Sequence, residues 1–257
     1  MTDFEKQTQK GNERVAVITG SSRGIGAAIA LDLANEGVRV VVNYHQRREA
    51  AEAVVSSIES AGGCAVAVEA DVATPEGNLL LAEAALKAFR RVDILVNNAT
   101  PLVERKPLLD LTLNEVDDYW RTYVQSSFLL AKQFVPGMKE RRFGRVIHIL
   151  TSYIWGVPPP ALTGYVVAKS ALWGLTKSMA VDLAPFGITV NAVSPAEVMT
   201  DQWKEVPEAR RRALELRTPL QRLAKPDDVA AAVRFLIGSQ GAFITGANIP
   251  VAGGAVM

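Results

Sequence analysis

Seven short runs of apolar, often β-branched residues recur along the 257-residue chain. These runs are nearly continuous in hydrophobicity, a pattern typical of strands buried on both faces of a parallel sheet. Segments rich in Ala, Leu and Glu lie between them and have the composition of helices. The predicted strands are 14–20, 38–44, 64–70, 92–99, 145–150, 188–194 and 248–253.

Strands and helices alternate throughout the chain. Crossovers between parallel strands are right-handed, so this alternation predicts helices on both faces of one sheet. No Pro-rich or Gly/Ser-rich linker interrupts residues 14–257. We therefore predict a single α/β domain, doubly wound, with a seven-stranded parallel sheet. Residues 1–13 are predicted to be a flexible N-terminal segment.

One stretch, residues 197–224, breaks the alternation with a mixed polar and helical insertion before the last helix and strand. Long insertions in compact domains often act as lids. In doubly wound sheets, ligands bind beyond the carboxyl ends of the strands. We therefore expect 197–224 to be a substrate lid, and we expect the chemistry to lie just after each strand.

Composition narrows the functional classes. The 28 Lys and Arg residues nearly balance the 27 Asp and Glu residues, so no overall field recruits nucleic acid or a membrane surface. The single cysteine, Cys64, excludes an internal disulfide framework and fits a reducing compartment. Two histidines and one cysteine supply few metal ligands. With no secretory or membrane-spanning pattern, we expect a cytoplasmic protein without a metal site.

The stretch TGSSRGIG, residues 19–26, follows the first predicted strand and opens a helix. Glycines there let the backbone approach a pyrophosphate, and the helix N-terminus directs amide groups at it. The same glycines would also serve a plain tight turn. These residues also fit G-x-S-x-G, with Ser22 as the nucleophile of a hydrolase. That alternative needs a downstream histidine on a loop, and the histidines are His45 and His148, the latter within a predicted strand.

Further motifs occur in a set order: NNA at 97–99, YVVAK at 165–169 and VSPAEVMT at 193–200. Together with TGSSRGIG, they make the sequence resemble the short-chain dehydrogenase/reductase family, most strongly its 3-oxoacyl-(acyl carrier protein) reductase branch. The resemblance extends from residue 14 to the end of the chain. It implies a Rossmann-like fold and an oxidoreductase that uses a nicotinamide dinucleotide.

The family's Tyr-x-x-x-Lys pair falls on Tyr165 and Lys169, and its serine on Ser152, with Thr151 as the alternative. Residues four apart share a helix face, so the tyrosine and lysine can meet. A tyrosine with a pKa of about 10 needs help to pass a proton at neutral pH, and a nearby ammonium favours the phenolate. The resemblance implies that Ser152 hydrogen-bonds the substrate oxygen while Tyr165 protonates it.

The resemblance also implies contacts along a bound dinucleotide. The glycine turn would hold the pyrophosphate, and residues after the middle strands would contact the adenosine. Residues after the sixth strand would bind the carboxamide of the nicotinamide. Lys169 would hold the nicotinamide ribose. The predicted cofactor-binding residues are Gly20, Ser22, Arg23, Gly24, Ile25, Gly26, Asn43, Asp71, Val72, Asn98, Ala99, Tyr165, Lys169, Pro195, Val198 and Thr200.

The choice between NAD(H) and NADP(H) depends on the charge of the side chains that follow the second predicted strand. An acidic residue there would bind the ribose diol of NAD and repel a 2′-phosphate. This chain instead has Asn43, Tyr44 and His45, with Arg23 in the glycine turn and Arg47 nearby. Two guanidinium groups could bind a phosphate. We therefore expect NADP(H) in preference to NAD(H), although both arginines could equally be solvated surface residues.

Several positions depart from the family pattern. Tyr123 stands where the family has an asparagine that is thought to hold a water linking the lysine to solvent. Ser126 and Ser127, one turn away, are candidates to replace it in reprotonating Tyr165. NNAG is NNAT here, so Thr100 replaces a glycine, and the following Pro101 stiffens the loop. Pro-Gly after the sixth strand is Pro-Ala.

We therefore expect an NADPH-dependent enzyme that reduces a small-molecule ketone to a secondary alcohol. Substrates linked to acyl carrier protein or coenzyme A, including 3-oxoacyl thioesters, are among the candidates. Phe186 replaces one of the two basic residues used for carrier docking, whereas Arg142 matches the other. A secondary alcohol or sugar dehydrogenase and a non-catalytic dinucleotide-binding protein are the alternatives. The resemblance implies a homotetramer.

Overall fold

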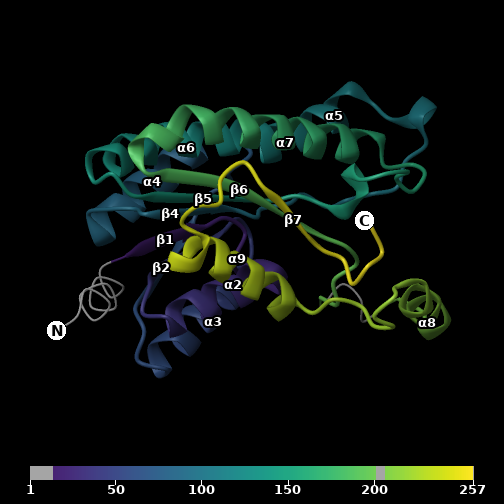
Figure 1. The fold of residues 1–257 in the computed structure, drawn as a ribbon, viewed down its shortest axis with the longest axis horizontal. Coiled ribbons are helices and arrows are strands. Elements are labelled where there is room, and N and C mark those ends of the chain that lie inside the picture. The colour runs from purple at the N-terminus through teal and green to yellow at the C-terminus, as the bar shows by residue number, and fades with distance from the viewer. Residues whose placement is uncertain (1–13, 201–205, 257) are drawn as a thin grey trace.

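The computed structural model describes residues 14–200 and 206–256. The predicted flexible segment, 1–13, lies outside the described residues. One parallel sheet of seven strands runs through the molecule in the order β3-β2-β1-β4-β5-β6-β7 (Figure 1). The strands are β1 (Val15–Ile18), β2 (Arg39–Tyr44), β3 (Ala65–Glu69), β4 (Ile94–Asn97), β5 (Gly144–Ile149), β6 (Ile188–Pro195) and β7 (Asn248–Val251). This confirms the predicted fold class.

Helices cover both faces of the sheet, so neighbouring strand residues are buried on opposite sides. In β1, Ala16 and Ile18 pack in one apolar core, while Val15 and Val17 pack in the other. Figure 1 shows α2, α3 and α9 beneath the sheet and α4, α6 and α7 above it. The helices are α2 (Gly24–Asn35), α3 (Arg48–Ser60), α4 (Pro75–Phe89), α5 (Leu113–Trp120), α6 (Ser126–Glu140), α7 (Thr163–Leu183), α8 (Glu208–Arg217) and α9 (Pro226–Ile237).

Helices α5 and α6 join through a π-helical segment, η3 (Arg121–Gln125), with helical backbone angles at both junctions. The composite helix begins with a capping box, in which Thr112 and Glu115 satisfy each other's backbone N–H groups. Single π-helical turns inside α-helices widen the backbone locally and occur often at functional sites. Tyr123 is the central residue of η3 and is buried.

From β1 the chain adds β2 and β3 on one side of the sheet and then returns to add β4 to β7 on the other side. The topological reversal therefore lies between β1 and β4. Ligands of doubly wound sheets bind in the crevice at such a reversal, beyond the carboxyl ends of the strands. The glycine turn after β1 and the NNA stretch after β4 both reach this edge. No helix among residues 14–200 and 206–256 has the length and apolar character needed to cross a membrane.

The described residues of the insertion between β6 and α9 include α8, which Figure 1 shows away from the sheet. The two ends of the insertion are held together by a parallel bridge between Val198 and Ala224. The Met199 N–H donates to the Ala224 carbonyl at 2.8 Å, and the Ala224 N–H donates to the Glu197 carbonyl at 3.2 Å. The insertion therefore leaves and rejoins the domain at one point. Part of the predicted lid, 201–205, lies outside the described residues.

Candidate active site

The turn after β1 brings its backbone close to the end of β4. Gly20 has φ +62°, and a Cβ there would lie 2.9 Å from the Ala99 Cα. At Gly26 a Cβ would meet the Asn98 side-chain nitrogen at 2.6 Å and the Gly20 carbonyl at 2.6 Å. Side chains at these two positions would therefore clash with the backbone and with Asn98. These glycines let the first turn of α2 pack directly against β4.

Polar side chains hold this turn in place. The Thr19 hydroxyl accepts hydrogen bonds from the N–H groups of Asn98 and Ala99, at 2.9 and 3.0 Å. The Asn98 amide in turn donates to the Thr19 and Gly20 carbonyls. Ser21 donates to the Ile18 carbonyl at 2.7 Å and accepts from the backbone of β2. Sequence reasoning did not single out Thr19 and Ser21, although short polar residues directly after a strand are the signal for such anchoring.

Asn43 lies at the expected edge of the sheet and also supports the glycine turn. Its side chain is buried, accepts from the Gly20 N–H at 3.0 Å, and donates toward three backbone carbonyls, the nearest being that of Ala70 at 3.0 Å. Its amide therefore ties the glycine turn to the ends of β2 and β3. Asn43 lines the adjoining cavity, but its hydrogen-bonding groups are already used within the protein.

A cavity of about 800 Å³ opens above the glycine turn. It is lined by residues following β1, β2, β3 and β4, together with Thr200 after β6. These walls bring together much of the predicted set, namely Gly20, Ser22, Arg23, Gly24, Ile25, Gly26, Asn43, Asp71, Val72, Asn98, Ala99 and Thr200. Pro195 and Val198 do not line it, since Pro195 pairs with β7 and the Val198 side chain is buried in the core.

The outer rim of this cavity is basic. Arg23 and Arg47 both line it, and neither forms an ion pair within residues 14–200 and 206–256. The neighbouring Arg48 is instead held by Glu69 at 2.7 Å. His45 lies 4.0 Å from Asp71 at the same rim. The close glycine backbone and the helix N-terminus fit the pyrophosphate of a dinucleotide, and the two guanidinium groups add positive charge at the rim.

Tyr165 and Lys169 lie on α7, near the carboxyl end of β5. The Lys169 side chain is buried and donates from Nζ to the Ile149 carbonyl at 2.6 Å. Burial disfavours the ammonium and lowers the pKa of Lys169 to about 7. The Nζ atom lies 6.0 Å from the centre of the Tyr165 ring. The expected pairing on one helix face is therefore present.

Burial raises the pKa of Tyr165 to about 12, and the Glu197 carboxylate adds to this rise. A hydrogen-bonding contact with the Thr151 side chain opposes it. Thr151 also accepts from the Tyr153 N–H at 3.3 Å. Ser152 is buried at the start of a 3₁₀ turn and lines the neighbouring substrate-side cavity. Of the two hydroxyl residues considered for the serine role, Thr151 thus contacts Tyr165, and Ser152 borders the cavity.

Two further tyrosines, Tyr119 and Tyr123, pack against this pair. Tyr119 and Tyr123 are stacked with ring centres 6.1 Å apart, and each meets Tyr165 edge-on at about 6 Å. The Lys169 Nζ lies 3.8 Å from the centre of the Tyr123 ring. The Tyr123 hydroxyl is 2.6 Å from the Thr100 hydroxyl. Tyr123 and Thr100, two positions expected to depart from the family pattern, are therefore in direct contact.

The two serines expected to take over the reprotonation of Tyr165 form hydrogen bonds with other groups. Ser126 donates to the Asn78 side chain at 3.1 Å, and Ser127 donates to the Tyr123 carbonyl at 2.7 Å. Both are buried within α6. His148 is also poorly placed for the Ser22 hydrolase: it is buried in β5 against Thr176, and burial lowers its pKa to about 3.

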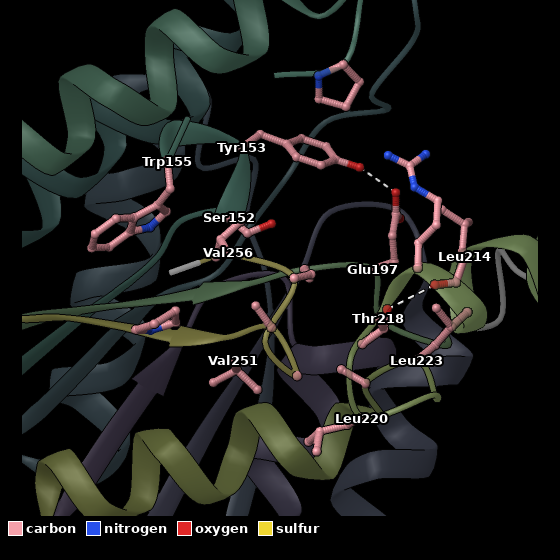
Figure 2. Close-up of a pocket in the computed structure, with 18 of the residues that line it drawn as sticks. Ser152, Tyr153, Trp155, Glu197, Leu214, Thr218, Leu220, Leu223, Val251 and Val256 are labelled. Atoms are coloured by element: carbon pink, nitrogen blue, oxygen red, sulfur yellow. Dashed lines mark hydrogen bonds between the residues drawn. The ribbon is translucent and has the colours of Figure 1, made fainter. Parts of the chain in front are cut away.

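A second cavity, of about 990 Å³, lies beside the first. Its walls come from the loop after β5, the insertion before α9 and the carboxyl-terminal segment, with apolar side chains such as Trp155, Leu214 and Val251. Figure 2 shows the hydroxyl of Tyr153 facing the carboxylate of Glu197, with which it forms a hydrogen bond. This bond links the loop after β5 to the insertion. Sequence reasoning missed this pair, because 44 positions separate the two residues.

Comparison with known proteins agrees with this geometry. A family model described as enoyl-(acyl carrier protein) reductase matches residues 20–256. The chain is 37% identical over 242 residues to 3-oxoacyl-[acyl-carrier-protein] reductase of Staphylococcus aureus, covering 94% of this chain and 98% of that protein.

Two solved structures are also similar. A mutant of a Serratia marcescens short-chain dehydrogenase/reductase has a TM-score of 0.88 at 37% identity, covering 94% of this chain and 97% of that one. A Burkholderia cenocepacia short chain dehydrogenase in complex with NADP has a TM-score of 0.85 at 36% identity, covering 95% and 98%.

Proposed function

The chain belongs to the short-chain dehydrogenase/reductase family of oxidoreductases, and we propose that it reduces a ketone to a secondary alcohol with NADPH. The observation that carries this proposal is the pair on α7, partly buried Tyr165 with buried Lys169, which lies beside Thr151 and the Ile149 carbonyl at the end of β5. A buried ammonium near a phenol lowers the cost of forming the phenolate as the proton leaves.

Each residue of the pair has a distinct part in this proposal. Tyr165 donates its proton to the substrate oxygen, and Lys169 stabilises the phenolate left behind. Ser152, on the wall of the substrate-side cavity, hydrogen-bonds the same oxygen, while Thr151 orients the Tyr165 hydroxyl. The bound cofactor supplies the hydride. Thr200 borders the cofactor side through the segment after β6.

The preference for NADPH over NADH is supported by the basic rim of the cofactor cavity. Arg23 and Arg47 face it without carboxylate partners among the described residues. No acidic residue follows β2 directly, so nothing there repels a 2′-phosphate. The solved Burkholderia cenocepacia relative is in complex with NADP. An unphosphorylated ribose would leave both guanidinium groups unpaired.

The substrate-side cavity suits a carbonyl compound with a sizeable apolar part, since its walls include Trp155, three consecutive prolines and several aliphatic side chains. A 3-oxoacyl thioester is the second candidate, favoured by the activity named for the Staphylococcus aureus relative. Against carrier docking, Arg142 donates to the Pro185 carbonyl and Phe186 is covered by Lys139 at 4.1 Å. We therefore favour a free or coenzyme A-linked ketone over a carrier-bound one.

We also propose that the chain forms a homotetramer. Phe128 on α6 and Val167 and Val181 on α7 are at least half exposed, and Phe243 is fully exposed. Large apolar residues in such numbers on outer helices are typical of subunit interfaces. A monomeric mass by light scattering at micromolar concentration would contradict this.

The proposed function is tested by Tyr165→Phe, which removes one hydroxyl and keeps the ring. We expect turnover of ketones to fall by about 10²–10⁴-fold, the range for loss of a general acid. NADPH binding, measured by fluorescence titration, should stay within twofold of the wild type. A panel of ketones and quinones with NADPH and NADH, followed at the nicotinamide absorbance, supplies the assay. Full turnover by the variant, or no turnover by the wild type on the whole panel, would contradict the proposal.

A further inference from the structure

An aromatic ring packs against Lys169, at the position where the resemblance to the family implies a water-binding amide. The Nζ atom lies 3.8 Å from the centre of the Tyr123 ring. An ammonium over the face of a tyrosine within about 6 Å is attracted by the negative face of the ring, and most strongly when both are desolvated. Both Lys169 and Tyr123 are buried.

The ring is fixed by a bond that relatives with glycine at position 100 would lack. The Thr100 hydroxyl donates to the Pro101 carbonyl at 3.1 Å, so its single proton is used there. The Tyr123 hydroxyl, 2.6 Å away, therefore donates to the Thr100 oxygen. Burial raises the pKa of Tyr123 well above its ordinary value, which keeps the phenol neutral. Tyr123 therefore acts on Lys169 through the face of its ring and not as an anion.

We infer that Tyr123, held by Thr100, is a positioning residue that keeps the Lys169 ammonium charged and aimed toward Tyr165. This inference rests on the proposed function, because it concerns the same catalytic pair. The Ile149 carbonyl holds the ammonium from β5, and the Tyr123 ring holds it from η3. The pair needs no amide-held water to keep the charge in place.

Other ionisable groups near Lys169 do not provide this stabilisation. His148, on β5, is neutral because burial lowers its pKa to about 3. Tyr119, on α5, is a phenol whose pKa is raised by burial. Tyr165 shares α7 with Lys169 and is the group that the ammonium serves, while Glu197 acts on Tyr165. Among these described side chains, the Tyr123 ring therefore adds to the Ile149 carbonyl in offsetting the cost of burying the charge.

The test is the pH profile of kcat/KM for ketone reduction, which reports the Tyr165–Lys169 pair as a coupled unit. Removing the ring in Tyr123→Leu destabilises the ammonium, so the pair loses its proton at lower pH. We expect the alkaline limb to move down by about one pH unit, as a desolvated cation–π contact implies. Tyr123→Phe keeps the ring and should leave the limb within about 0.3 units. Thr100→Val breaks the same hydrogen bond from the other side and keeps the ring, so it should also leave the limb within about 0.3 units.

Phenylalanines carrying successive fluorines at position 123 keep the ring's shape and weaken its negative face. The alkaline limb of the pH profile should then move to lower pH with each added fluorine, which a purely structural role would not produce. If the wild type turns over and the limb is unchanged in both Tyr123→Leu and the fluorinated series, the inference is wrong while the proposed function stands. If the wild type does not turn over, NMR titration of ¹³C-labelled Lys169 in the same variants gives the shift directly, and an unchanged titration overturns the inference.

Discussion

The two cavities along the carboxyl edge of the sheet depend on different kinds of residues. The proposed cofactor side is lined by glycine backbone and by polar side chains such as Asn43, and Thr19 and Ser21 support its turn through hydrogen bonds within the protein. The side proposed to be catalytic depends on long side chains, Tyr165 and Lys169, whose pKa values are displaced by burial. The first side is built from backbone and short side chains held by hydrogen bonds, and the second from long ionisable side chains packed among other groups.

This difference implies that the two sides fail in different ways. Damage to the cofactor side should appear first as lost stability and lost affinity, since its side chains support the backbone. Damage to the catalytic side should appear as changed rates and pH dependence, with the fold intact. The variants of Tyr165 and Tyr123 probe the catalytic side, and three further changes sharpen the contrast.

The largest effect is expected from Asn43→Ala. Its buried amide bonds the Gly20 N–H and the carbonyls at the ends of β2 and β3. Leaving those groups unpaired should lower the free energy of unfolding by about 3 kcal/mol, since each buried unsatisfied group costs about 1–3 kcal/mol. Urea unfolding measures this, and NADPH affinity should fall with it. Unchanged stability would show that the cofactor side does not depend on this network.

A medium effect is expected from Arg23→Ala and Arg47→Ala. Each should weaken NADPH binding about tenfold, the loss that one charge-assisted contact to the 2′-phosphate implies, and leave NADH binding unchanged. Arg48→Ala is the matched control, because that guanidinium is already paired with Glu69. Isothermal titration with both cofactors measures the difference. Equal losses for NADPH and NADH would contradict recognition of a 2′-phosphate.

The smallest effect is expected from Glu197→Gln on the catalytic side. The carboxylate raises the pKa of Tyr165 because a nearby negative charge disfavours the phenolate. Its removal should therefore lower that pKa and move the alkaline limb of reduction to lower pH, by roughly half a unit or less at the dielectric of a partly solvated site. Tyr153→Phe breaks the same hydrogen bond but keeps the charge, and should not shift the limb. A shift toward higher pH would contradict this sign.

The contrast also separates what the sequence predicts from what it does not. All seven strands and the doubly wound order follow from local runs of apolar residues, because burial on both faces marks each strand by itself. Tyr165 and Lys169 lie on one helix face because their spacing alone requires it. The Thr100–Tyr123 bond joins segments that only tertiary packing brings together, so no local pattern predicts it.

The hydrogen bonds of some polar residues are unpredictable for the same reason. Asn43 lines the predicted cofactor cavity, and its amide is used within the sheet edge. Ser126 and Ser127 share a helix face with Tyr123 but bond to Asn78 and to backbone instead. A polar residue near a site can serve the ligand or the scaffold, and the choice depends on neighbours distant in sequence.

The bridge between Val198 and Ala224 has a further consequence for engineering this enzyme class. The two ends of the insertion meet at one parallel bridge, where Val198 and Ala224 are already held together by hydrogen bonds. The segment between these residues can therefore be exchanged as a unit. Exchanging the segment between them for that of another family member would replace a wall of the substrate-side cavity without redrawing the sheet or the α7 pair. Loop grafting would then change the walls of this cavity while Tyr165 and Lys169 stay in place.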